Sequence, residues 1–325
     1  MLITRHDLRG WRVSPDIYRW FIRHFPSGGR YADVHSLLIQ SGRVNWATSL
    51  VEYAYSLWLE KEGFVRQETQ ATDLLACGLN QTQDAGLDFV RPSPAVSPYA
   101  YSQKVASQID GYRWMDVDNA SQIGCSGDDA RIGSCGGSAR ISCSGVNAHI
   151  GSTGEYGWLS SSGYASQIAS AGYASRIGCV GHDVRIGSSG DRARIACAGN
   201  SAKVSSTGDG VRAANAGMRG RIGSAGERAK VANAGDLCHV SSFGAQSAIA
   251  NVGDGARLVA MGDAAQVVST GSVDYVILGP GACAALSYFD GERTRFAIAY
   301  EGENGIRAGV RYCLNGRHEF VEYQG

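Results

Sequence analysis

The sequence predicts a mainly β protein built around a parallel β-solenoid, and three observations lead to this fold class. A glycine occupies every ninth position from Gly127 to Gly271. The residues between these glycines follow the unit Gly-x-x-Ala-x-Ile-x-Ser-x, which puts small, large and small side chains at alternate positions. Alternate positions share one face of a β-strand, and nine residues are too few for a pair of helices. A short fixed period over about half of a chain is typical of a solenoid.

The composition of position 7 predicts the length of one coil, when the repeat is numbered from 0 at the glycine. In every second repeat, position 7 holds the residues Cys125, Cys143, Ser161, Cys179, Cys197, Asn215, Asn233, Asn251 and Ser269. The intervening repeats hold serine or alanine at this position. An 18-residue coil with two strands on opposite walls explains this sorting, whereas a nine-residue coil would mix the two sets. The three asparagines are then expected to form a side-chain amide ladder along one wall.

The turn and the inner cysteines complete the expected coil. Positions 8, 0, 1 and 2 are expected to form the turn, in which glycine supplies backbone conformations that other residues resist. Two pairs of cysteines, Cys125 with Cys143 and Cys179 with Cys197, should be neighbours on adjacent coils. We interpret them as small buried side chains, with a disulfide or redox role as the alternative.

The solenoid is expected over residues 118–279, as about nine coils, and its flanking segments are expected to be caps. Residues 1–63 predict a helical domain, because Ser14-Pro15 has the form of a helix start and apolar residues follow at helical spacing. Residues 280–325 predict a small antiparallel β cap, in which Asp290-Gly291 and Asn315-Gly316 are hairpin turn signals.

Residues 64–117 are expected to be a linker followed by an irregular first coil. Three prolines, Pro92, Pro94 and Pro98, interrupt any regular element there. The segment 106–109 repeats the sequence of 120–123, but the distance between the two segments is not a multiple of the repeat period. We therefore expect a first coil that departs from the regular period.

Composition gives no general sign of a nucleic-acid or membrane partner and bears on the expected location. Lys and Arg together number 30, as do Asp and Glu, so no net charge directs the chain to nucleic acid or to a membrane. The beginning of the sequence lacks the apolar core of a signal peptide, and no apolar run is long enough to span a bilayer. Nine cysteines without a secretion signal favour a reducing compartment, and we expect a cytoplasmic protein.

No motif for catalysis, metal binding or cofactor binding is apparent. The cysteines have no CxxC spacing, the seven histidines are dispersed, and P-loop, dinucleotide and nucleophile-elbow signatures are missing. Calcium-binding β-rolls place an Asp ligand where this repeat has Ile. We expect no cofactor, no metal and no enzymatic activity, with an enzyme sited in the end domains as the least favoured hypothesis.

Position 4 should face outward and carry a basic stripe on each wall. On the first wall the basic residues are Arg140, Arg176, Arg194, Arg212 and Lys230. On the second wall they include Arg131, Arg185, Lys203, Arg221 and Arg257. Position 6 beside them is small, which leaves a flat floor. These stripes are either a binding surface for an acidic protein or phosphates, or solvated charges paired with acidic residues of the turns.

One repeat departs from the pattern, because Trp158 stands at position 4 where Arg or Gln is usual. Tyr156 and Trp158 should lie near Tyr173 on the next coil, between Arg140 and Arg176. Exposed aromatic residues flanked by arginine have the composition of a binding hot spot. Drift of the repeat without function is the alternative interpretation.

The repeat Ser-Ser-Gly-Asp-Arg-Ala-Arg-Ile over residues 188–195 resembles the repeats of bacterial and phage nonapeptide-repeat β-solenoid proteins. Segments at both ends, around Tyr18 and over 290–306, are also similar to that group. The resemblance implies a bacterial or phage source, and thus the cytoplasm of a bacterium or of a phage-infected host cell. It transfers no activity and no functional residue.

These observations lead to two principal hypotheses. The first is a non-enzymatic solenoid scaffold that presents a rigid surface to a protein partner, with a phage or prophage role against a host protein resting on the resemblance alone. The second is a nucleic-acid or nucleotide binder that uses the basic stripes. Unpaired strands at the ends or edges of the solenoid also allow self-association as a further hypothesis.

Overall fold

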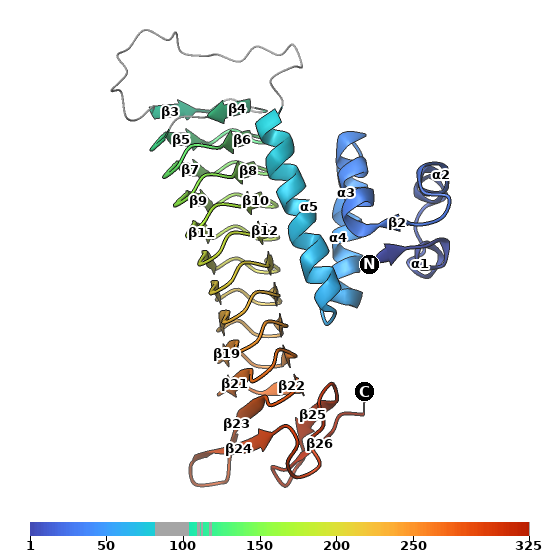
Figure 1. The fold of residues 1–325 in the computed structure, drawn as a ribbon, viewed down its shortest axis with the longest axis vertical. Helices are drawn as coiled ribbons and strands as arrows, with labels where there is room; N and C mark the ends of the chain where they lie inside the picture. The colour runs from blue at the N-terminus through green and yellow to red at the C-terminus, as the bar shows by residue number, and fades with distance from the viewer. Residues whose placement is uncertain (82–103, 109–110, 112, 117–118, 325) are drawn as a thin grey trace.

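A computed structural model shows a β-solenoid rod with a helical domain packed against one side of it (Figure 1). The structure describes residues 1–81, 104–108, 111, 113–116 and 119–324. The predicted fold class is confirmed, because a helical region precedes a parallel solenoid of about nine turns that ends in antiparallel strands.

Successive short strands of the rod alternate between two sheets, so one coil contains two strands and therefore two nonapeptides. Within a sheet each residue lies opposite its equivalent two repeats later, as Ile177 lies opposite Ile195 and Ile168 opposite Ile186. The coil of two nonapeptides predicted from position 7 is therefore confirmed.

We call the two sheets the free wall and the covered wall. The free wall contains β3 (Lys104–Ser107), β5 (Gln122–Cys125), β7 (Arg140–Cys143), β9 (Trp158–Ser161), β11 (Arg176–Cys179), β13 (Arg194–Cys197), β15 (Arg212–Asn215), β17 (Lys230–Asn233), β19 (Ala248–Asn251), β21 (Gln266–Ser269) and β23 (Cys283–Phe289). The covered wall contains β4 (Arg113–Asp116), β6 (Arg131–Ser134), β8 (His149–Ser152), β10 (Gln167–Ser170), β12 (Arg185–Ser188), β14 (Lys203–Ser206), β16 (Arg221–Ser224), β18 (His239–Ser242), β20 (Ala256–Ala260) and β22 (Val273–Leu278).

The corner glycines are required by close approach between coils. A Cβ atom on Gly145 would lie 1.9 Å from the carbonyl oxygen of Gly127, one coil earlier, and similar contacts recur at every ninth residue up to Gly271. The expectation that glycine supplies an unusual backbone conformation at position 0 was wrong. The left-handed residue of the turn is at position 2, as at Asp183 and Arg192, which both have a φ of 55°.

The predicted asparagine ladder is confirmed inside the free wall. The Nδ2 of Asn215 donates to the Oδ1 of Asn233 at 2.9 Å, and the Nδ2 of Asn233 donates to the Oδ1 of Asn251 at 2.7 Å. The same Nδ2 atoms also donate to backbone carbonyls two residues on, those of Gly217 and Gly235. Each amide thus joins its own turn to the next coil, which satisfies polar groups that are buried in the rod.

The N-terminal domain is helical, as expected, and has its own aromatic core. Its elements are β1 (Leu2–Ile3), α1 (Arg5–Gly10), α2 (Pro15–His24), β2 (Gly29–Arg30), α3 (Tyr31–Gln40), α4 (Val44–Trp58) and α5 (Glu62–Gln81). The predicted start of α2 is confirmed, since Ser14 Oγ accepts a hydrogen bond from the Ile17 N–H and Pro15 is the first helical residue.

Helix α5 corrects the expectation of a linker that begins at residue 64. The helix lies lengthwise along the covered wall (Figure 1), and its buried face includes Val65, Glu68 and Thr72. Polar residues on this face obscure the apolar periodicity, and the helix is stabilised by packing against the rod. The prolines expected to interrupt structure, at 92, 94 and 98, lie outside the described residues.

The first described coil also differs from the expected irregular one. Strand β3 pairs in parallel with β5, so that Val105 lies opposite Ile123 in the same register as in the later coils. The sequence match between 106–109 and 120–123 does not correspond to the pairing, because Ala106 lies opposite Gly124, and Ile109 lies outside the described residues. Backbone pairing between neighbouring coils, rather than local sequence similarity, determines the register.

The helical domain buries the middle of the position-4 column on the covered wall, where outward-facing cations were expected. Arg131 and Arg257, toward the two ends of this column, are exposed as expected. The residues Arg185 and Lys203 are only 4% and 5% exposed. Arg185 donates from Nε and Nη2 to the carboxylate of Glu68 at 2.6 and 2.7 Å, and from Nη1 to Nε2 of His35 at 2.6 Å. The Tyr31 hydroxyl donates to the same carboxylate at 2.6 Å.

Two further carboxylates of the helical domain hold the rod along the same wall. Glu52 of α4 pairs with Lys203 at 2.5 Å and with Arg221 at 3.3 Å. Glu60 accepts hydrogen bonds from Tyr275 and, at 2.8 Å, from Arg311. The basic stripe of the covered wall is therefore largely neutralised within the chain.

The C-terminal segment extends each wall separately instead of forming one small sheet across the end of the rod. Strand β24 (Thr294–Tyr300) pairs antiparallel with β23 of the free wall. Strands β25 (Arg311–Leu314) and β26 (Phe320–Glu322) continue the covered wall beyond β22, also antiparallel. The change from parallel to antiparallel pairing ends the repeat. The C-terminal strands are antiparallel, as predicted, but they extend the two walls and do not form a separate sheet.

Three histidines between the helical domain and the covered wall have imidazole pKa values that are lowered by burial. Desolvation by burial, together with Arg131, lowers the pKa of His149 to about 4, and burial lowers the pKa of His239 to about 4. Burial also lowers the pKa of His35 well below 6.5. Burial of Asp73 on α5 acts in the opposite sense, because it raises the pKa of that carboxyl to about 6.

We predict that the folded state loses stability as the pH falls from 6.5 to 4. In this window the unfolded chain binds more protons at the histidines than the folded chain does, and their effect outweighs that of Asp73. Urea unfolding followed at several pH values should show a smaller pH slope for His149→Gln than for the wild type, by up to about one proton. The exposed His6→Gln is the matched control, and equal slopes for wild type and His149→Gln would contradict the prediction.

Candidate functional site

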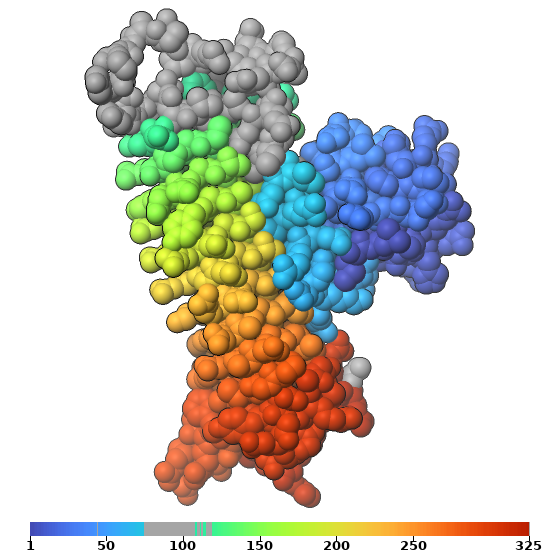
Figure 2. All heavy atoms as spheres, viewed as in Figure 1, coloured from blue at the N-terminus to red at the C-terminus, as the bar shows by residue number. Residues whose placement is uncertain are grey.

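The free wall exposes three columns of side chains along the rod, at repeat positions 4, 6 and 8. Within a strand such as β13, Arg194 and Ala196 point outward, whereas Ile195 and Cys197 are buried in the rod. Because neighbouring strands are in register, residues at one repeat position form a straight column with a spacing of about 4.8 Å. In the described residues no helix lies on this wall, and Figure 2 shows the helical domain in blue against the other side of the rod.

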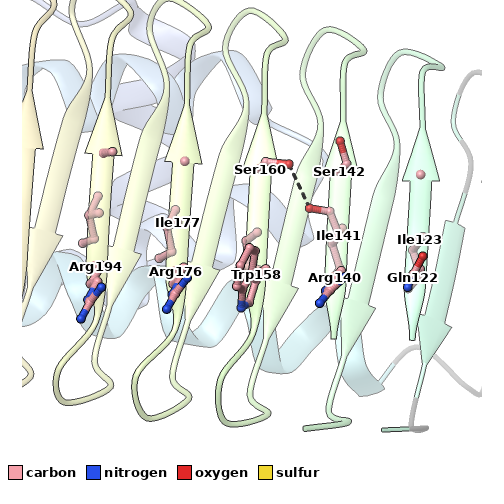
Figure 3. Close-up of a pocket in the computed structure, with 15 residues that line it drawn as sticks. Gln122, Ile123, Arg140, Ile141, Ser142, Trp158, Ser160, Arg176, Ile177 and Arg194 are labelled. Carbon is pink, nitrogen blue, oxygen red and sulfur yellow. Dashed lines mark hydrogen bonds between the residues drawn. The ribbon is translucent and has the colours of Figure 1, made fainter. Parts of the chain in front are cut away.

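The basic residues of position 4 form what we call the basic ridge, which consists of Arg140, Arg176, Arg194, Arg212 and Lys230. Figure 3 shows the upper part of this column, at the same end of neighbouring strands. All five side chains are exposed, and in the described part of the chain none of them has a carboxylate within ion-pair distance. The positive charges of the ridge are therefore not balanced by carboxylates of the described residues, and like charges on adjacent strands repel each other.

Trp158 occupies position 4 of the strand between those of Arg140 and Arg176, so its indole lies between two guanidinium groups. The Cζ atoms of Arg140 and Arg176 lie 5.2 and 4.5 Å from the centre of its ring. The indole remains 46% exposed. The predicted grouping of Trp158 with its two flanking arginines is therefore present, as a cation–π stack along the column.

A second cluster lies in the turns that lead into the free wall. The rings of Tyr156 and Tyr173 meet edge to face with centroids 5.8 Å apart. The guanidinium of Arg192 lies 5.6 Å from the centre of the Tyr173 ring. Tyr156 is thus near Tyr173, as expected. Arg192 was not predicted, although its place at position 2 of the next coil is visible in the sequence.

The acidic residues of the turns have a structural role that separates them from the basic ridge. The Oδ1 of Asp191 accepts a hydrogen bond from the backbone N–H of Asp209, and the Oδ1 of Asp209 accepts one from that of Glu227, both at 2.8 Å. These acids therefore stabilise the backbone of the following coil. The interpretation in which turn acids neutralise the stripe is not supported for the basic ridge.

Beside the basic ridge lies what we call the small-residue floor, which is formed by position 6. Its members are Gly124, Ser142, Ser160, Gly178, Ala196, Ala214, Ala232 and Ala250. The ridge and the floor enclose an open groove of ≈ 780 Å³ in the upper part of the wall. The Ser160 hydroxyl is occupied there, since it donates to the Ile141 carbonyl at 3.3 Å (Figure 3).

Toward the C-terminal half of the rod the exposed face becomes apolar. From Gly178 onward the floor is glycine and alanine, and the adjoining position 8 holds Val180, Ala198, Ala216, Ala234 and Val252. Val180 and Val252 are among the most exposed large apolar side chains in the described residues. An exposed apolar strip next to a row of cations is typical of an interaction surface.

The predicted inner residues lie behind this surface and do not reach it. Cys125, Cys143, Cys179 and Cys197 are buried and free, with each predicted pair in register on adjacent strands. Burial raises the pKa of the Cys143 thiol to about 11. Such a thiol is a poor nucleophile at neutral pH, which favours the interpretation of Cys143 as a small buried residue.

Among the described side chains, no three His, Cys, Asp or Glu residues come together in a group that could hold a metal ion. None of the described helices combines the length and the apolar character that crossing a bilayer requires.

Comparisons with known proteins find a family model that matches the helical domain and a relative that matches nearly the whole chain. Residues 1–59 match the family model described as the YdhT N-terminal domain, and this range ends directly after α4. The chain is 62% identical over 322 residues to the uncharacterized protein YdhT of Escherichia coli (strain K12). That alignment covers 99% of this chain and 100% of the relative. No solved structure matches the chain.

The contrast between the two walls predicts that the same substitution, Arg to Ala, lowers the stability strongly on the covered wall and hardly at all on the free wall. Arg185→Ala leaves Glu68, which is 0% exposed, as an uncompensated buried charge and should lower the free energy of unfolding by about 3–5 kcal/mol. Arg194→Ala removes an exposed, unpaired cation and should change it by less than about 0.5 kcal/mol. Urea unfolding followed by tryptophan fluorescence measures both, and a similar loss for the two variants would refute this assignment of the walls.

Proposed function

The chain belongs to the YdhT family, and we propose that it is a non-enzymatic solenoid scaffold whose free wall binds a partner protein. The observation that carries this proposal is the difference in charge pairing at position 4. Arg185, Lys203 and Arg221 on the covered wall have carboxylate partners from the helical domain. The basic ridge has none among the described residues, and it adjoins an exposed apolar strip.

The shape of the wall supports a protein partner. Parallel pairing from coil to coil holds the exposed columns in a rigid lattice, so little conformational freedom would be lost on binding. Trp158, Tyr156 and Arg176 supply residue types that are enriched at binding hot spots, and the exposed indole lies within the row of cations. The apolar strip would contribute burial that a purely ionic partner cannot use.

The resemblance to bacterial and phage repeat proteins extends the proposal to a host protein as the partner, bound or inhibited in the bacterial cytoplasm. The nine cysteines favour such a reducing compartment. Nucleic-acid binding is the second candidate, because the ridge alternates unpaired cations with an aromatic ring on which a base could stack. Self-association through the outermost strands, β24 and β26, is a further candidate.

Affinity capture from Escherichia coli lysate tests the proposal with two matched variants. The ridge variant carries Arg176→Ala, Arg194→Ala and Arg212→Ala. The control variant carries Arg9→Ala, Arg19→Ala and Arg23→Ala, which remove the same charge from exposed sites on the helical domain. Quantitative mass spectrometry should show one or a few proteins that wild type and control retain and the ridge variant loses, because each of these ridge cations would contact the partner.

Nuclease treatment of the lysate separates the candidates. Retention that survives the treatment supports a protein partner, whereas retention that disappears with it supports nucleic acid. Identical recovery by the ridge and control variants would exclude the basic ridge as the binding surface.

A further inference from the structure

The covered wall shows which kind of element fits the outer face of this repeat. Helix α5 runs along that wall and places Val65, Glu68 and Thr72 on three of the contact points. The carboxylate of Glu68 lies on the basic position 4 of β12, at Arg185. The small side chain of Thr72 lies over position 6 of the same strand, at Gly187. The same helix thus supplies the carboxylate that pairs with Arg185 and the side chain that covers the neighbouring Gly187.

The spacing of helix turns matches the spacing of coils. Val65 lies over Gly223 in β16 and Thr72 over Gly187 in β12, which are two coils apart. Seven helical residues rise about 10.5 Å, and two coils span about 9.6 Å. Helix residues one turn apart therefore meet successive strands, so a carboxylate on every turn would meet a cation on every coil.

Small residues at position 6 allow the helix to approach. A Cβ atom on Gly187 would lie 1.7 Å from the Thr72 hydroxyl oxygen, and one on Gly223 would lie 2.6 Å from a methyl group of Val65. A larger side chain at either site would push α5 away from the wall. The small-residue floor of the free wall has the same form, and a Cβ atom on Gly178 would meet nothing within 4 Å.

The free wall has both components of this helix site without the helix. Arg176, Arg194, Arg212 and Lys230 occupy position 4 on consecutive strands of the wall, and Gly178, Ala196, Ala214 and Ala232 occupy position 6 beside them. The cations lack ion-pair partners among the described residues, so the wall complements a negatively charged ligand. An extended strand fits the columns less well, because its side chains on one face are about 6.6 Å apart while the columns repeat about every 4.8 Å.

We propose that the free wall binds an amphipathic helix of the partner protein, with Glu or Asp repeated at i, i+3 or i+4, and i+7 along its contacting face. This inference rests on the proposed function and specifies the chemistry of the partner. Carboxylates of the helix pair with the basic ridge, its small or apolar residues lie on the floor from Gly178 to Ala250, and Trp158 contacts the end of the helix. The complex repeats on the free wall the arrangement that α5 makes on the covered wall.

Two synthetic peptides of identical composition, each long enough for about six helical turns, test this inference. In the first, Glu residues occupy one helical face at i, i+4 and i+7 in an alanine-rich sequence; in the second, the same Glu residues are spread around the helix. Fluorescence anisotropy measures binding to the full-length wild type, the ridge variant and the control variant described above. Circular dichroism of the bound peptide reports whether it is helical.

We expect the first peptide to bind wild type and control at least about fivefold more tightly than the second, and the ridge variant to bind it about tenfold more weakly. Ala214→Leu should also weaken binding, because its bulk lifts the helix from the floor while leaving every charge in place. The open face around Ala214 makes this substitution tolerable to the fold.

Other outcomes overturn the inference in distinguishable ways. Equal binding of both peptides, or equal competition by single-stranded DNA of the same length, would show that charge alone is recognised and that no helix is selected. Insensitivity to Ala214→Leu would exclude contact with the floor. If the peptides fail while ridge-dependent capture of a lysate protein succeeds, the helix inference falls and the proposed function stands; if both fail, the free wall is not the binding surface.

Discussion

The close contact between corner glycines of successive coils is the constraint on which the rest of the structure depends. Along the rod, each described corner glycine from Gly145 onward approaches the carbonyl of the glycine one coil earlier so closely that no Cβ atom fits between them. This contact keeps the period of the coil, and the period keeps inner and outer residues in columns. The asparagine ladder, the turn acids that bind the next coil and the basic ridge all depend on that register.

Both walls are built from the same repeat unit, but among the described residues only the covered wall is packed against the helical domain. On the covered wall, small residues at position 6, mostly glycine and serine, lie beneath α5 and its neighbours, and at position 4 Arg185 is buried against Glu68. On the free wall, alanine takes much of position 6 and the cations remain unpaired in the described residues. The chain thus contains, in its own helical domain, an example of the interaction that we propose for its partner.

Much of the rod could be predicted from sequence because its determinants are local and periodic. The sorting of cysteine and asparagine at position 7 predicted the coil, the walls and the ladder of Asn215, Asn233 and Asn251. Helix α5 was missed because its buried face mixes Val65 with Glu68 and Thr72, and these polar residues are satisfied only by the rod. The same long-range contact buries Arg185, which looks like any other outward cation of the repeat. The excess of glycine at position 6 of one set of repeats was the available signal for a covering element.

The most direct test of this account compares two glycine substitutions in the rod. Gly199→Ala would place a methyl group 1.8 Å from the carbonyl oxygen of Gly181, whereas Gly178→Ala would place one where nothing lies within 4 Å. The free energy of unfolding should fall by about 1–3 kcal/mol or more for Gly199→Ala. It should stay the same or rise by about 0.4–1 kcal/mol for Gly178→Ala, through the lower entropy of the unfolded chain. Equal effects of the two substitutions would contradict the claim that contact between corner glycines sets the coil.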